Sequence, residues 1–145
     1  MASLRLGFCI MNWQAERRPS HIVAVFERQP FWGPELQRQF KQSSVEVREC
    51  RVVGDLLPTI EEFPSALIFI DLESGLEECL SWLRSELRVH PHPCPVIACG
   101  AATATDLAWV LREAGVTALL AEFVPGEKLA RLCRRQLGLQ PRPVR

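Results

Sequence analysis

Asp71 carries the side chain best placed for chemistry in this sequence. It follows directly on the apolar run from Ala66 to Ile70, and such a run predicts a strand that is buried on both faces of a sheet. The strand would end at the carboxyl edge of the sheet, where ligands bind in open α/β folds. The carboxylate could take part in binding there, or it could cap the following loop by accepting hydrogen bonds near Ser74 and Gly75.

Five apolar runs alternate with five segments of helical periodicity, and together they predict the elements that position Asp71. The predicted strands cover residues 22–26, 45–52, 67–70, 95–99 and 116–120. The predicted helices cover residues 34–42, 55–62, 74–90, 103–115 and 127–137, with Asp55, Ser74 and Thr103 or Thr105 as candidate caps. This alternation predicts an α/β fold of the flavodoxin type, with a parallel five-stranded sheet of order 2-1-3-4-5, right-handed crossovers and helices on both faces.

Composition narrows the functional classes. The 145 residues suit one domain with a single core, and the 17 basic and 17 acidic side chains give a formal net charge of zero. This balance argues against a direct nucleic-acid partner, because nucleic-acid binders carry a basic excess. No run approaches the roughly 20 apolar residues that a membrane span requires.

The six cysteines are expected to be reduced, structural thiols of a cytoplasmic protein. They lie at positions 9, 50, 79, 94, 99 and 133, without a C-x-x-C pair and without a histidine at the spacing of a zinc site. A metal site at His90, His92 and Cys94 is the less favoured alternative.

The predicted domain covers residues 21–137. Residues 1–20 are interpreted as an extension, which would be an extra strand, an arm that packs on a neighbour or a disordered leader. Residues 138–145 form a short basic tail.

Residues 21–137 resemble the receiver (CheY-like) domain of bacterial two-component response regulators. The resemblance rests on the order of the elements and on three local matches. The first strand ends at Glu27, Asp71 falls at the position of the family's phosphoacceptor, and Ala114-Gly115-Val116 precedes the fifth strand.

The resemblance implies that phosphoryl chemistry at Asp71 would need Mg²⁺. In the family two acids after the first strand help to hold the cation; here these positions are Phe26 and Glu27, so one carboxylate remains. The backbone carbonyl of Glu73 would complete the implied site, and Glu27 and Asp71 are therefore the candidate metal ligands.

The implied switch positions are altered as well. The Ser or Thr that ends the family's fourth strand aligns with Gly100, while Thr103 lies a little beyond. The lysine that pairs with the phosphoryl oxygens aligns with Glu122, and the proline after it aligns with Phe123. The predicted acidic pocket comprises Glu27, Asp71, Glu73 and Glu122.

These departures predict a degenerate receiver, or pseudo-receiver, that is not an enzyme and needs no cofactor. An aspartyl phosphate brings about two negative charges, and a glutamate in place of lysine repels them. The predicted function is phosphorylation-independent signalling or docking on another protein or on a second copy, with a homodimer expected. One alternative is an active receiver phosphorylated on Asp71 with Mg²⁺, and another is a small flavodoxin-like protein that binds a nucleotide or other ligand, although the sequence lacks a P-loop and a G-x-G-x-x-G motif.

The resemblance also implies a docking face made by the fourth predicted helix, the fifth strand and the last helix. A tryptophan among arginines is typical of an interface hot spot. The candidate residues are Trp109, Arg112, Leu119, Ala121, Arg131 and Arg135. Packing in the core is the alternative for Trp109, and Trp82 has the same two interpretations.

Overall fold

A parallel sheet forms the centre of the molecule. The computed structural model describes residues 19–91, 94–100 and 105–139. Five strands form the sheet in the order β2-β1-β3-β4-β5, and all its pairs are parallel. The strands are β1 (His21–Phe26), β2 (Val45–Cys50), β3 (Ser65–Asp71), β4 (Val96–Cys99) and β5 (Ala118–Leu120). The predicted fold class and strand order are confirmed.

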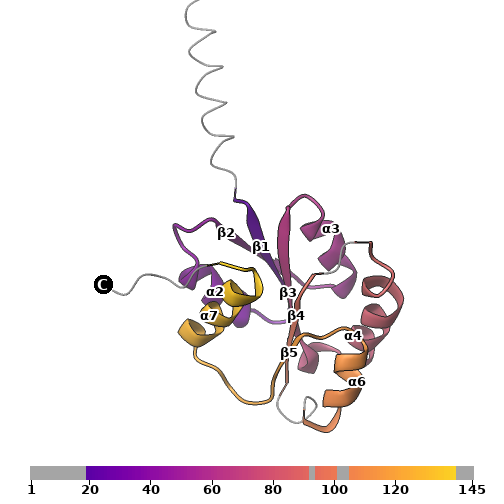
Figure 1. The fold of residues 1–145 in the computed structure, drawn as a ribbon. Helices are drawn as coiled ribbons and strands as arrows, with labels where there is room; N and C mark the ends of the chain where they lie inside the picture. Colours follow the sequence, from indigo (N-terminus) through magenta and orange to yellow (C-terminus); the bar gives the residue numbers. More distant parts are fainter. Residues whose placement is uncertain (1–18, 92–93, 101–104, 140–145) are drawn as a thin grey trace, which may run out of the picture.

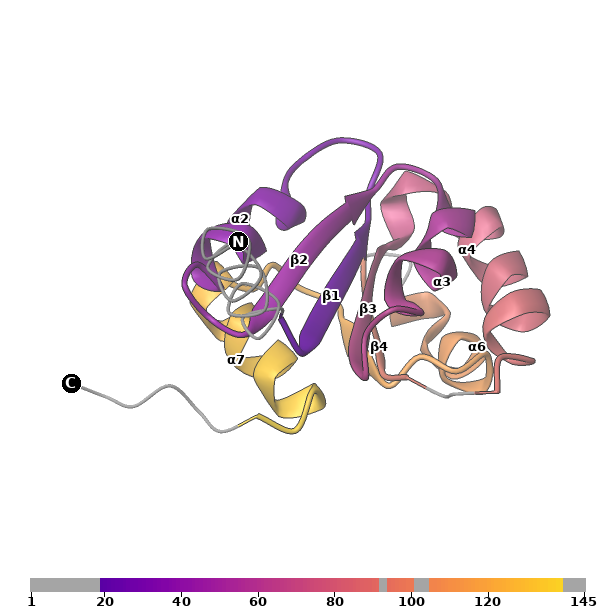
Figure 2. The ribbon, with the colours of Figure 1, turned by 90° about the horizontal axis from the view of Figure 1, so that it is seen from above.

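Helices cover both faces of this sheet, as the two views in Figures 1 and 2 show. One face carries α2 (Trp32–Gln39) and α7 (Gly126–Gln136), and the other carries α3 (Leu56–Ile60), α4 (Leu76–Trp82) and α6 (Ala108–Glu113). The connections include the 3₁₀ turns η1 (Val53–Asp55) and η2 (Leu72–Ser74), and α4 continues into the π-helical turn η3 (Leu83–Leu87). In the described part of the chain, no helix has the length and apolar character that crossing a bilayer would require.

The apolar runs build two cores because side chains alternate across a strand. Ile22 and Ile68 lie in the core beneath α3, α4 and α6, whereas Val23 and Leu67 lie in the core beneath α2 and α7. Both faces of β1 and of the central part of β3 are therefore buried, which is why these segments are continuously apolar. Burial on both faces leaves only the strand ends free for polar side chains.

Several local predictions differ from the structure. The second strand ends at Cys50 rather than at residue 52, and its pairing with β1 ends at the same residue. The side chains of Asp55 and Ser74 do not cap α3 and α4; the residue before α4 is Gly75, which has no side chain to offer. The fifth strand begins at residue 118 rather than 116, since the amide of Val116 still bonds to Leu111 at the end of α6.

The described cysteines are free thiols, and most are buried. Cys50, Cys79, Cys99 and Cys133 lie in the two cores, and Cys94 is half-buried. Burial raises the pKa of both Cys79 and Cys133 to about 12. The expectation of buried structural thiols is confirmed for these residues, while Cys9 and His92 lie outside the described residues.

The thiols predict that the free energy of unfolding falls in alkali. Unfolded thiols ionise near pH 9, whereas Cys79 and Cys133 in the folded chain keep their protons until about pH 12. The unfolded state therefore loses protons first, and stability should decrease as the pH rises from about 9 toward 12. Urea unfolding at a series of pH values measures this slope, and the double variant Cys79→Ala, Cys133→Ala should show a shallower one. An equal slope in both proteins would show that Cys79 and Cys133 do not cause the loss of stability in alkali.

Candidate functional site

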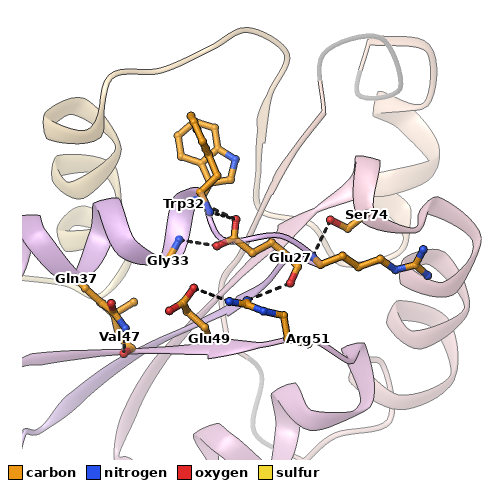
Figure 3. Close-up of polar contacts among 10 residues, drawn as sticks. Glu27, Trp32, Gly33, Gln37, Val47, Glu49, Arg51 and Ser74 are labelled. Carbon is orange, nitrogen blue, oxygen red and sulfur yellow. Dashed lines mark hydrogen bonds and ion pairs between the residues drawn. The ribbon is translucent and has the colours of Figure 1, made fainter.

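Glu27 is the only buried charged residue in the described part of the chain, with 1% of its surface exposed. It follows β1 at the carboxyl edge of the sheet, as predicted. Its Oε1 accepts hydrogen bonds from the backbone N–H groups of Phe31 (3.1 Å) and Trp32 (2.9 Å), and its Oε2 accepts one from Gly33 (2.7 Å) (Figure 3). The carboxylate thus satisfies three amides at the start of α2.

This arrangement is a cap supplied from outside the helix. The residue before α2, Phe31, makes no side-chain cap bond, so the free N–H groups of the first turn need another acceptor. A negative charge at this end is also favoured by the helix dipole. Gly33 fits closely here, since a Cβ would collide with the side chain of Glu49, and Arg51 links the Glu49 carboxylate (3.0 Å) to the Glu27 carbonyl oxygen (3.2 Å).

Asp71 lies at the end of β3 and is half-buried, and it caps the turn that follows. Its Oδ1 accepts a hydrogen bond from the Glu73 amide (3.1 Å), and its Oδ2 accepts one from the Ser74 hydroxyl (2.9 Å). The capping interpretation of Asp71 is confirmed. The exposed side chain of Glu73 takes no part, because only its backbone amide is used.

Ser74 connects the turn after β3 to the loop after β1. Its Oγ accepts a hydrogen bond from the Arg28 amide (3.0 Å), and its hydroxyl donates one to Asp71. The Arg28 guanidinium pairs with Glu78 on α4 at 2.6 Å. The two loops that carry Glu27 and Asp71 are therefore held to each other by a short polar chain.

The buried thiol of Cys99 lies below Asp71, with its Sγ 3.9 Å from Oδ1. Burial raises the pKa of Cys99 strongly, and the carboxylates of Asp71, Glu73 and Glu27 raise it further. A thiol that stays protonated is not a nucleophile, so Cys99 does not supply covalent chemistry at this edge.

The arrangement is poorly suited to the predicted Mg²⁺. The oxygens of Glu27 and Asp71 already accept six protein hydrogen bonds, counting the long one from the Cys99 thiol, so a cation would have to share these oxygens with their donors. Within residues 19–91, 94–100 and 105–139, no three His, Cys, Asp or Glu side chains form a group that could hold a metal ion.

Glu122 is not grouped with the other three acids of the predicted pocket. It lies in the exposed loop between β5 and α7, whereas Glu27, Asp71 and Glu73 are all close enough to Cys99 to raise its pKa. Gly100 follows β4, as predicted, at a φ of 144°, and a Cβ there would lie 3.1 Å from that of Leu72. Thr103 lies outside the described residues.

An aromatic cluster joins the loop after β1 to the loop after β5, and the sequence analysis missed it. The ring of Trp32 lies 4.9 Å from Phe31, 5.7 Å from Phe123 and 5.6 Å from the buried Phe69. Phe31 and Phe123 are nonetheless 56% and 70% exposed. Phe123 therefore packs over the first turn of α2, at the position where the receiver resemblance had pointed to a proline.

The candidate docking residues occupy three elements. Trp109 on α6 is 73% exposed, so its alternative assignment to the core is wrong, whereas Trp82 is 3% exposed and does belong to the core. Leu119 is half-buried in β5, an edge strand of the sheet. The exposed residues that accompany them are Arg112, Ala121, Arg131 and Arg135, of which Arg131 lies 3.8 Å from Glu127.

Comparisons with solved structures support the receiver fold. A response regulator from Thermotoga maritima superposes with a TM-score of 0.67 at 15% sequence identity, over 82% of this chain and 98% of that one. A signal receiver domain of a two-component histidine kinase from Clostridium thermocellum superposes with a TM-score of 0.56 at 16% identity, over 83% and 98%. No family model and no curated protein matches the sequence. The chain thus has the CheY-like receiver fold, and the predicted resemblance is confirmed at this level.

Removing the Glu27 carboxylate should destabilise the fold. Glu27→Ala leaves three amides at the start of α2 without their acceptor, and the expected loss is about 2 kcal/mol in the free energy of unfolding. Urea denaturation measures it, with the exposed Glu122→Gln as the matched control, for which a change within about 0.5 kcal/mol is expected. Equal stability of the two variants would show that Glu27 is not a cap.

Proposed function

We propose that this chain is a receiver-like signalling or docking module that works without phosphorylation. The observation that carries the proposal is the buried Glu27 carboxylate, whose oxygens bind the first amides of α2 instead of facing a cation. The receiver fold supplies the framework, because receiver domains are signalling modules that act through protein partners.

Charge supports this proposal. Two negative charges at Asp71 would meet Glu27 and Glu73 nearby, and no lysine lies in the described loop that follows β5. An opposed pair of unit charges at about 4 Å contributes roughly 4 kcal/mol at an effective dielectric constant near 20. Losing the lysine and one metal carboxylate would therefore slow phosphoryl transfer by orders of magnitude.

The hydrogen bonds of Asp71 support it further. An oxygen of Asp71 that attacked a phosphodonor would also be the acceptor for the Glu73 amide or the Ser74 hydroxyl, and these donors lower its nucleophilicity. A phosphoryl group on Oδ2 would also lie beside Ser74, which links the two loops through Arg28. Asp71 is better suited to a structural role at this edge than to a cycle of phosphorylation and dephosphorylation.

Treatment with a small acyl phosphate and Mg²⁺ tests the proposal. We expect the intact mass to stay that of the unmodified chain, at a donor concentration that fully phosphorylates a competent response regulator run in parallel. The Asp71→Asn variant is the matched control for modification elsewhere on the chain. A gain of one phosphoryl group that is lost in Asp71→Asn would contradict the proposal and favour the active receiver.

We also propose that the module self-associates through α6, β5 and α7. Trp109 is a large exposed apolar side chain on α6, and the outer edge of β5 carries no further strand in the described sheet. Such a surface suits a second copy of the chain because an isologous contact would cover both tryptophans.

Replacing Trp109 should weaken the dimer. Trp109→Ala is expected to raise the dissociation constant at least about tenfold, since buried tryptophans are frequent hot spots. Sedimentation equilibrium measures it, and Val89→Ala is the control, because Val89 is equally exposed but lies in the turn between η3 and β4. A wild-type chain that stays monomeric, or a Trp109→Ala chain that dimerises as well as the wild type, would reject this surface.

A further inference from the structure

A groove lies at the opposite edge of the sheet from Asp71. It has a volume of about 770 Å³ and lies at the amino ends of β3 and β4. The segments that line it lead into β3 and β4, and the end of α7 closes one side. Its lining includes Ile60, Phe63, Pro64, Ala66, Pro95 and Gln136.

The groove has more apolar than polar character and no convergent set of charged groups. Glu61 is the one acid among its described lining residues; it is exposed and has no ion pair within the described chain. The polar side chains of its lining are Glu61, Ser65, His90 and Gln136, and apolar side chains outnumber them. An apolar segment with a single positive charge would suit this lining.

The sequence carries such a segment ahead of β1. Residues 4–13 read Leu-Arg-Leu-Gly-Phe-Cys-Ile-Met-Asn-Trp, in which Arg5 is the only charged residue. The chain enters β1 at His21, and the sheet partner of His21 is Ser65, which lines the groove. The seven residues between Trp13 and His21 span up to about 24 Å when extended, so the segment can reach the whole groove.

His21 adds an independent observation. Its Nδ1 is buried at this edge and has no hydrogen-bond partner among the described residues. A buried polar atom without a partner is costly, and a backbone N–H group of an added segment would remove that cost. An apolar segment with one positive charge and free backbone N–H groups would therefore suit the unpaired nitrogen, the unpaired Glu61 and the apolar lining.

We propose that residues 4–13 of the same chain bind in this groove. Leu4, Leu6, Phe8 and Ile10 stand at alternate positions, so an extended segment would place them on one side, against the groove. Arg5 complements Glu61. The amino-terminal segment is then part of the folded module and covers the edge of the sheet that faces away from Asp71.

Photo-crosslinking of the full-length chain tests this assignment. Phe8 is replaced by benzoylphenylalanine, the protein is irradiated at low concentration, and the linked peptides are mapped by mass spectrometry. We expect links to the peptides that contain Phe63 to Ala66 or Cys94 to Pro95, and their loss when Leu6 and Ile10 are also changed to serine. Links elsewhere, or no links, would overturn the proposal.

Mixing chains of two isotopic compositions before irradiation distinguishes the alternative occupant. Links within one isotopic composition support the proposal, whereas links that join the two compositions would overturn it and assign the groove to the segment of a second copy. In the chain with its natural Phe8, hydrogen exchange gives a second reading. The amides of Phe63, Ser65 and Ala66 should exchange about tenfold faster in Leu6→Ser, Ile10→Ser than in the wild type, and unchanged exchange would also overturn the proposal.

Discussion

The carboxylate of Glu27 is buried at the end of β1, and its three hydrogen bonds to the amides of Phe31, Trp32 and Gly33 hold the first turn of α2 against the sheet. A buried charge persists only where polar groups replace the water that it has lost. The helix end provides such groups because its first amides have no partner within the helix. Both oxygens accept these bonds, so the residue that the resemblance assigned to a cation acts as a cap of α2 in this structure.

The rest of this sheet edge follows from that constraint. With α2 anchored at Glu27, Trp32 is held beside Phe69 and can receive Phe123 from the loop after β5. An aromatic contact thus joins two loops at an edge where receivers handle phosphate. On the other side, Asp71 and Ser74 bind the turn after β3 to the loop after β1. Both sets of contacts tie neighbouring loops to each other along this edge of the sheet.

The strand order and the two-sided burial could be predicted because five apolar runs alternate with helical periodicity, and little else accommodates that pattern. The cap at Asp71 could be predicted as well, since a carboxylate at a strand end usually bonds to the following turn. The role of Glu27 could not, because its partners are backbone amides, which have no signature in the side-chain sequence. Trp109 and Trp82 stand in similar helical patterns, and only the packing of α4 and α6 on the sheet separates the exposed one from the buried one. Phe123 and Trp32 lie about ninety residues apart, so their contact is a product of topology.

The proposed function depends on the amides at the start of α2 binding the Glu27 carboxylate in place of a divalent cation. A titration of the isotopically labelled protein with Mg²⁺, followed through the amide resonances of Phe31, Trp32 and Gly33, tests it most directly. The account predicts that these three resonances keep their positions throughout the titration. Saturable shifts of all three, together with those of Glu73 and Ser74, would show a cation binding between Glu27 and Asp71 and would contradict it.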